Sequence, residues 1–431
     1  MVGLRKRLLF SIALVASIGC GRAPAVRHAE NGDFPALKRE LDDRAAKNDL
    51  GDGDVRAVSR AILEHDLHRY SGDEGARRLL ALSTCAKPIA SALKSTARAN
   101  DDIAATAAWV LVDSGAVDAD AFTDDRRDDK RFRAAVTRGL FDAGEAALRA
   151  ERAVDDDELV RRAAMAAAGD AGCASDFPLL LEAARRDPVA IVRIDAIRAL
   201  ARIAPRLDEG APRADLVDRL SDLWSGGDEA TRGAIARAFA VPALFDAGGR
   251  RALDNALGRE EGHATVDAAS AMMSAGGNNG ALRLIRLARE DDIAVRAHAL
   301  RLLDPARPDH AEVLLSTVNG KSEDATLQVV AAAALLRAPP HRQKGLDTLV
   351  ARMASSDKTG TEAAIALAEA GDERGRPRLV ADLATPSALR FRVSSALTRL
   401  GHAADVRPLL ASPDIDVRDG AACAILSTSK P

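Results

Sequence analysis

An apolar triplet that recurs along this chain constrains its fold more than any other feature. In each copy, mostly apolar residues occupy positions i, i+4 and i+8 of a stretch with helical character. The copies are Ile103/Ala107/Leu111, Phe132/Val136/Leu140, Val160/Ala164/Ala168, Val192/Ala196/Leu200, Thr231/Ile235/Phe239, Val295/Ala299/Leu303, Leu327/Ala331/Leu335, Leu389/Val393/Leu397 and Val417/Ala421/Ile425. Most opening residues are followed directly by Arg. Copies lie roughly 30 residues apart, and this period is typical of a solenoid whose stacked units share a core.

Two longer gaps between copies predict degenerate units near 264–273 and 360–368. Within a typical unit, Phe177–Arg186 is expected to form a first helix, and Asp187-Pro188 to start a second helix over 189–204. The sequence therefore predicts an all-α, right-handed α-solenoid of about ten to eleven helical hairpins, extended as one elongated body. The Gly-Gly-Asn-Asn-Gly run at 276–280 predicts the most flexible loop and a break in the superhelix.

Composition supports helices with a core of small side chains. Only 3% of the residues are aromatic, whereas strands favour aromatic and β-branched residues. The chain carries 64 acidic and 61 basic residues, a net charge of −3, with both signs mixed along its length. A nucleic-acid partner would need a basic stripe, so we expect none.

The N-terminus has the pattern of a secretory signal peptide. Arg5, Lys6 and Arg7 precede an apolar run over 8–18 that ends at Gly19-Cys20. As a helix this run would span only ~16 Å of a ~30 Å hydrocarbon core, too short for a transmembrane anchor. The stretch 17–20 resembles the lipobox of bacterial lipoproteins, although Ser17 departs from the usual Leu. The resemblance implies acylation of Cys20 and anchoring at the cell envelope, and Gly21 favours the outer membrane, facing the periplasm.

Domain boundaries follow from this pattern. We expect a lipoprotein signal peptide over 1–19, a tether over 20–33, an N-terminal helical cap over 34–86 and repeats over 87–431. Three further cysteines, Cys85, Cys173 and Cys423, are odd in number and widely spaced. They predict no disulfide framework, and Cys423 is expected to be a buried free thiol.

The second helices carry a family resemblance. DPVAIVRIDAIRALARIA at 187–204, DDDELVRRAAMAAAGDAG at 155–172 and EDDIAVRAHALRLLDP at 290–305 resemble the second helix of HEAT repeats, and are most similar to the bacterial type found in phycobilisome bilin lyases. The resemblance implies that a turn acid and the following Arg hold adjacent units together. These positions correspond here to Asp155/Arg161 and Asp187/Arg193, with Arg296 and Arg418 at equivalent places.

Short motifs typical of enzymes are absent from this chain, incomplete, or placed among predicted helical repeats. The paired His-Glu dipeptides of iron-dependent HEAT hydroxylases do not occur. Glu64, His65 and His68 share one helix, yet zinc normally takes three or four protein ligands. Ser91 with Lys94, and Lys358-Thr359-Gly360, match two β-lactamase signatures but lie among predicted helical repeats. Gly320-Lys321-Ser322 is half of a phosphate loop. We therefore expect no catalytic, cofactor or metal site.

The sequence favours a non-enzymatic scaffold that binds protein partners at the bacterial cell envelope. Two alternatives stay open. One is a subunit of a HEAT-like lyase or another enzyme, and the other is a cytoplasmic signalling adaptor, which would require translation to start downstream of the apolar run.

Overall fold

The computed structural model describes residues 23–99, 103–118, 130–259, 262–320, 324–385 and 387–428. Their regular elements are helices, and no strand occurs among them. None of these helices is long and apolar enough to cross a bilayer. The chain is an all-α solenoid of HEAT-like hairpins, which confirms the predicted fold class, and both degenerate units are present as α16 (His263–Ser274) and α22 (Lys358–Glu369).

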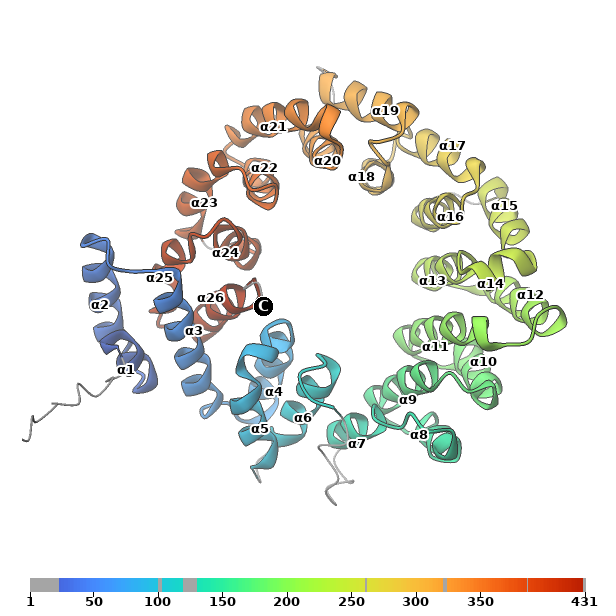
Figure 1. Cartoon of the computed structure of the whole chain (residues 1–431), viewed down its shortest axis with the longest axis horizontal. Coiled ribbons are helices and arrows are strands. Elements are labelled where there is room, and N and C mark those ends of the chain that lie inside the picture. Colours follow the sequence, from blue (N-terminus) through green and yellow to red (C-terminus); the bar gives the residue numbers. More distant parts are fainter. Residues whose placement is uncertain are drawn as a thin grey trace, which may run out of the picture.

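The hairpins pair an outer helix with an inner helix (Figure 1). The outer layer consists of α8 (Ala146–Arg152), α10 (Phe177–Arg186), α12 (Ala211–Gly226), α15 (Arg250–Arg259), α17 (Asn278–Leu287), α19 (Pro308–Asn319), α21 (Pro339–Met353), α23 (Arg376–Leu383) and α25 (Arg407–Leu410). The inner layer consists of α9 (Glu158–Ala171), α11 (Ala190–Ile203), α13 (Glu229–Phe239), α16, α18 (Ile293–Leu302), α20 (Ala325–Leu335), α22, α24 (Arg390–Arg399) and α26 (Ile415–Ser427). Before them come α1 (Pro24–Glu30), α2 (Phe34–Ala46), α3 (Asp52–Leu67), α4 (Gly72–Ala81), α5 (Ala90–Arg98), α6 (Ala104–Asp113) and α7 (Lys130–Thr137), and the short α14 (Pro242–Leu244) follows α13.

Aspartate N-caps begin most inner helices. The carboxylates of Asp157, Asp228, Asp292, Asp324, Asp357 and Asp414 accept hydrogen bonds from amides of the first turn. These bonds satisfy amides that have no partner within the helix. Helix α11 differs from the prediction, because it begins at Ala190 and Asp187 lies before its N-cap, Val189.

The solenoid closes into a ring (Figure 1). Helix α26 packs against α3, and one hydrophobic core includes residues from both ends of the chain, such as Ile62 and Leu93 with Val393 and Ile425. The expectation of an elongated open body is therefore wrong. The N-terminal helices do not shield a free end from solvent, because they supply the surface on which the last unit stacks.

Polar groups and a disulfide hold this closing junction. Arg418 Nε donates to Asp66 Oδ2 at 2.7 Å, and its guanidinium lies 3.8 Å from the centroid of the Phe34 ring. Tyr70 donates its hydroxyl proton to Asp419 Oδ2 at 2.5 Å. At the edge of the junction, Arg78 Nε donates to Asp416 Oδ1 at 2.7 Å.

Cys85 and Cys423 form a disulfide across the same junction. The prediction of a buried free thiol at Cys423 is therefore wrong. The prediction was based on the odd number and wide spacing of the cysteines. Ring closure nevertheless brings together two cysteines that are 338 positions apart. The remaining described cysteine, Cys173, is free and half-buried.

Two smaller expectations also fail. The part of the predicted tether that the structure describes contains α1, whose Ala25 and Ala29 are fully buried. The glycines near 276–280 do not break the superhelix, because α17 already begins at Asn278. A Cβ on Gly280 would lie 2.3 Å from the Ala269 carbonyl oxygen, so glycine is needed there for close packing of α17 on α16.

Candidate protein-binding surface

Arginines near the start of inner helices connect successive turns. Arg161 Nη1 donates to the Asp155 carbonyl at 2.8 Å, in the turn before its own helix, and Nε donates to Asp187 Oδ2 at 2.7 Å in the next unit. Arg193 repeats the pattern, with donation to the Asp187 carbonyl at 3.0 Å and to Asp228 Oδ2 at 2.8 Å. Each Arg thus contacts the turn acid of the following unit, offset by one unit from the pairing that the family resemblance implied.

The remaining predicted positions differ in their partners. Arg296 Nε donates to the Ala288 carbonyl at 3.4 Å, and Arg418 contacts Asp66 of the closing junction. Arg133 was not among the predicted positions, and its Nε donates to Asp155 Oδ2 at 3.0 Å. The signal was present, because Arg133 follows the opening Phe132 of its triplet.

The charged state of these groups is fixed by their contacts. Burial alone would raise the pKa of Asp155, but hydrogen bonds from Arg133 and the Asp157 amide outweigh it and hold that pKa below its ordinary value. The hydrogen bond to Asp187 raises the pKa of Arg161 against the opposing effect of burial. The Asp155 carboxylate and the Arg161 guanidinium therefore stay ionised, and they connect neighbouring units.

A second set of ion pairs lies on the inner layer and connects neighbouring inner helices. Examples are Arg162–Asp195 at 2.8 Å, Arg237–Asp267 at 3.3 Å and Arg399–Glu369 at 3.8 Å. His298 also lies 3.8 Å from Asp267, a contact that is ionic only when the imidazole is protonated. Burial lowers the pKa of His298, with Asp267 acting in the opposite direction. The inner face of the ring thus carries polar contacts between several pairs of neighbouring helices.

A groove interrupts this polar surface. It has a volume of about 310 Å³ and is lined by residues of α18, α20, α22 and α24 and of the turn after α20. Val329, Val330, Ala333 and Ala334 of α20 contribute to its lining together with Ala366 of α22. Arginines and glutamates of the flanking helices complete it. All its helices belong to the inner layer of the ring (Figure 1).

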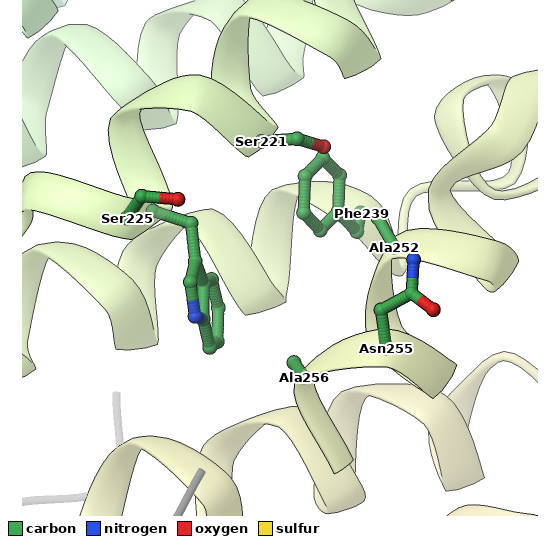
Figure 2. A pocket seen from close by; sticks show the side chains of 7 residues that line it. Ser221, Ser225, Phe239, Ala252, Asn255 and Ala256 are labelled. Carbon is green, nitrogen blue, oxygen red and sulfur yellow. The ribbon is translucent and has the colours of Figure 1, made fainter. Parts of the chain in front are cut away.

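A smaller cavity lies between α12, α13 and α15. Figure 2 shows Ser221, Phe239 and Asn255 around it, and Trp224 also contributes to its lining. Its volume of about 170 Å³ is below the ~300 Å³ at which ligand pockets usually begin. Trp224 and Phe239 are almost fully buried, so this cavity is a packing space between the layers.

The enzyme-like motifs lie in ordinary helical surroundings. Ser91 and Lys94 are on α5, and Lys358-Thr359-Gly360 forms the first turn of α22 instead of a strand. His65 Nδ1 donates to the Glu30 carbonyl at 2.9 Å. Across the described ranges, no group of three or more His, Cys, Asp or Glu could hold a metal ion. Cys20, the predicted lipidation site, lies outside the described residues.

These features define the class of the protein as an α-solenoid of HEAT-like repeats that closes into a ring. No family model matches the chain, and no curated protein matches its sequence. Among solved structures, the chain is similar to the complex of CpcE and CpcF of phycocyanin lyase from Nostoc sp. PCC7120, with 16% identity and a TM-score of 0.32 over 60% of this chain and 92% of that chain.

Two other solved structures show a similar degree of likeness. One is a mutant of Kap121p, with 12% identity and a TM-score of 0.32 over 92% of this chain and 47% of that chain. The other is She4p, with 12% identity and a TM-score of 0.27 over 88% of this chain and 64% of that chain. These similarities concern the helical-repeat architecture and assign no activity.

Proposed function

We propose that the protein is a non-enzymatic scaffold, anchored by lipid at Cys20 to the bacterial cell envelope, and that its inner face binds a protein partner. The observation that carries the proposal is the inner surface of the ring, to which most inner helices contribute charged side chains. Affinity on such a surface accumulates over many units. The outer membrane, with the ring facing the periplasm, is the site that the residues around Cys20 favour.

The disulfide supports export. Structural disulfides persist in oxidising compartments such as the periplasm and are rare in the reducing cytosol. The bridge between Cys85 and Cys423 therefore fits the signal-peptide pattern at the N-terminus and disfavours the alternative of a cytoplasmic adaptor.

Fractionation tests the lipid anchor. Stable anchoring needs two or more acyl chains, which a mature lipoprotein Cys supplies. The Cys20→Ala variant is expected to leave the membrane fraction and to lose label from a radioactive fatty acid. Cys173→Ala serves as the matched control and is expected to stay in the membrane fraction. A wild-type protein that takes up no label would rule out lipidation.

Site-specific photo-crosslinking in intact cells tests the binding surface. A photoreactive residue at Arg198, exposed on inner helix α11, is compared with one at Lys344, exposed on outer helix α21. The proposal predicts discrete protein adducts from the inner position and few from the outer one. Equal capture from both positions, or none from either, would argue against an inner binding face.

A further inference from the structure

Helix α20 differs from the inner helices around it in having no charged residue. Its sequence, ATLQVVAAAAL, is apolar on almost every side. One side packs into the shared core through Leu327, Ala331 and Leu335, which are fully buried. On another side, Ala333 is half-exposed and contributes to the groove lining with Val329 and Val330. A polar-faced inner helix would be expected here, because this layer is otherwise charged.

The ion pairs of the inner layer stop at this helix. They connect α13 to α16 through Arg237–Asp267, and Asp267 of α16 also lies 3.8 Å from the His298 imidazole of α18. They resume between α22 and α24 with Glu369–Arg399. Since α20 has no charged side chain, no ion pair can join it to α18 or α22. The groove therefore combines apolar side chains of α20 with charged side chains of α18, α22 and α24.

Two arginines at the groove have no ionic partner, whereas its glutamates do. Arg301 on α18 and Arg392 on α24 are exposed, and within the described ranges neither forms an ion pair. Glu362 contacts Lys358 at 3.5 Å, and Glu369 contacts Arg399 at 3.8 Å. The positive charge of the two arginines is thus left uncompensated by these glutamates.

A third arginine of the groove is held in place by backbone groups. Arg337 Nη2 donates to the Leu303 carbonyl at 2.6 Å and to the Arg301 carbonyl at 3.0 Å. These carbonyls lie at the C-terminal end of α18, where a cation is favourable. Its charge is fixed beside the apolar lining and adds to the positive character of the groove.

We propose that this groove, lined by residues of α18, α20, α22 and α24, binds an acidic segment of a partner protein, with small apolar side chains against α20 and carboxylates near Arg301 and Arg392. Neighbouring packed helices lie 8–10 Å apart, so the four helices span roughly 25–30 Å. An extended segment of about eight residues covers that distance. This inference rests on the proposed scaffold function and names the site and the chemistry of the partner.

Selection from a phage-displayed library of random peptides on the purified, disulfide-intact ring tests the inference. Ala333→Arg places a long charged side chain in the groove. Ala166→Arg is the matched control, because Ala166 is also half-exposed and stands six residues after Val160, as Ala333 stands six after Leu327. Three other inner helices already carry Arg six residues after the opening residue of their triplet, namely Arg198, Arg237 and Arg301. Both variants are therefore expected to fold.

The expected peptides carry small apolar residues flanked by Asp or Glu. Their dissociation constant should rise about tenfold or more in Ala333→Arg and stay unchanged in Ala166→Arg. In the double variant Arg301→Gln/Arg392→Gln, binding should weaken and depend less on salt, because fewer charge contacts remain. Any of three results would overturn the inference. The selected peptides could be basic, Ala333→Arg and Ala166→Arg could weaken binding equally, or selection on the wild-type ring could give no enrichment over selection on the Ala333→Arg ring.

The two proposals fail in different ways. If crosslinking at Arg198 captures a partner while selected peptides ignore Ala333→Arg, the groove is not the binding site and the scaffold function stands. If neither experiment detects binding, both proposals fall.

Discussion

The junction between α9 and α11 and the junction between α26 and α3 use the same type of contact in different surroundings. In both, the Arg that follows the opening residue of an inner helix donates to a carboxylate at 2.7 Å. Asp187, at the regular junction, lies in a turn and also accepts from the Val189 amide at 2.9 Å. Asp66, at the closing junction, lies near the end of α3, and its side chain is fully buried.

The comparison shows how one repeated position serves both stacking and closure. A turn acid beside a helix N-terminus keeps favourable partners even when the Arg is removed. Asp66 has no helix N-terminus beside it, and its other cationic neighbour, Arg69, is exposed and lies 3.9 Å away. The closing junction therefore depends more strongly on Arg418. The closing junction also contains a disulfide. A regular junction does not require one, because the two units that it joins are adjacent in the sequence.

Loss of the disulfide is expected to have the largest effect. The bridge closes a loop of 338 residues, and the chain-entropy relation assigns about 6 kcal/mol to a loop of that size. The double variant Cys85→Ser/Cys423→Ser should therefore unfold at a clearly lower urea concentration than the wild type under non-reducing conditions. Small-angle scattering should show a larger fraction of open rings.

The free cysteine offers the matched control for this experiment. Cys173→Ser, at a half-buried position, should change the unfolding midpoint little. If the double variant unfolds at the same urea concentration as Cys173→Ser, the bridge does not contribute to closure.

Removal of Arg418 is expected to have the next largest effect. Arg418→Met removes the buried cation of Asp66 and leaves only the exposed Arg69 at 3.9 Å. Breaking a buried ion pair in this way typically costs about 3–5 kcal/mol. Arg161→Met should cost less, because Asp187 keeps the Val189 amide and the start of α11. Urea unfolding of the two variants measures the difference. Equal losses would show that the two junctions are energetically equivalent.

Most of the repeat architecture could be predicted from the sequence, because it depends on local periodicity. The triplet opened by Val160 indicates a buried stripe, and the trailing Arg161 marks a contact beyond that stripe. Closure could not be predicted, since it depends on the summed rotation of all units, which no local pattern encodes. The sequence around Asp66 and Cys85 therefore does not indicate which residues they contact. The groove on α20 could not be predicted either, because it is formed by four helices that are separate in the sequence.

A pH dependence should distinguish the closing junction from the regular one. Burial raises the pKa of Asp419 to about 8, and the nearby charge of Asp66 acts in the same direction. The unfolded chain releases this proton near pH 4, about the ordinary value for Asp. The folded protein thus binds more protons between pH 4 and 8, so its stability should fall as pH rises through this window.

The Asp419→Asn variant tests this assignment. Its amide group can still accept from Tyr70 but does not titrate, so the decline in Tm between pH 5 and 8.5 should become shallower by a few degrees. Asp155, whose pKa is lowered, acts in the opposite direction and only below about pH 4, outside this range. An unchanged slope in Asp419→Asn would remove this carboxyl from the pH response.

The smallest expected effect concerns Tyr70, the only tyrosine in the chain. Burial, together with the neighbouring Asp419, raises the pKa of its phenol. Alkaline titration followed by phenolate absorbance should therefore show no ionisation at the ordinary value of about 10 while the ring stays closed. Tyr70→Phe removes the hydrogen bond to Asp419 and should cost about 1 kcal/mol in urea unfolding. Ionisation near pH 10 in the folded wild type would mean that water reaches the Tyr70 hydroxyl. The closing junction would then not differ from the regular one by its burial.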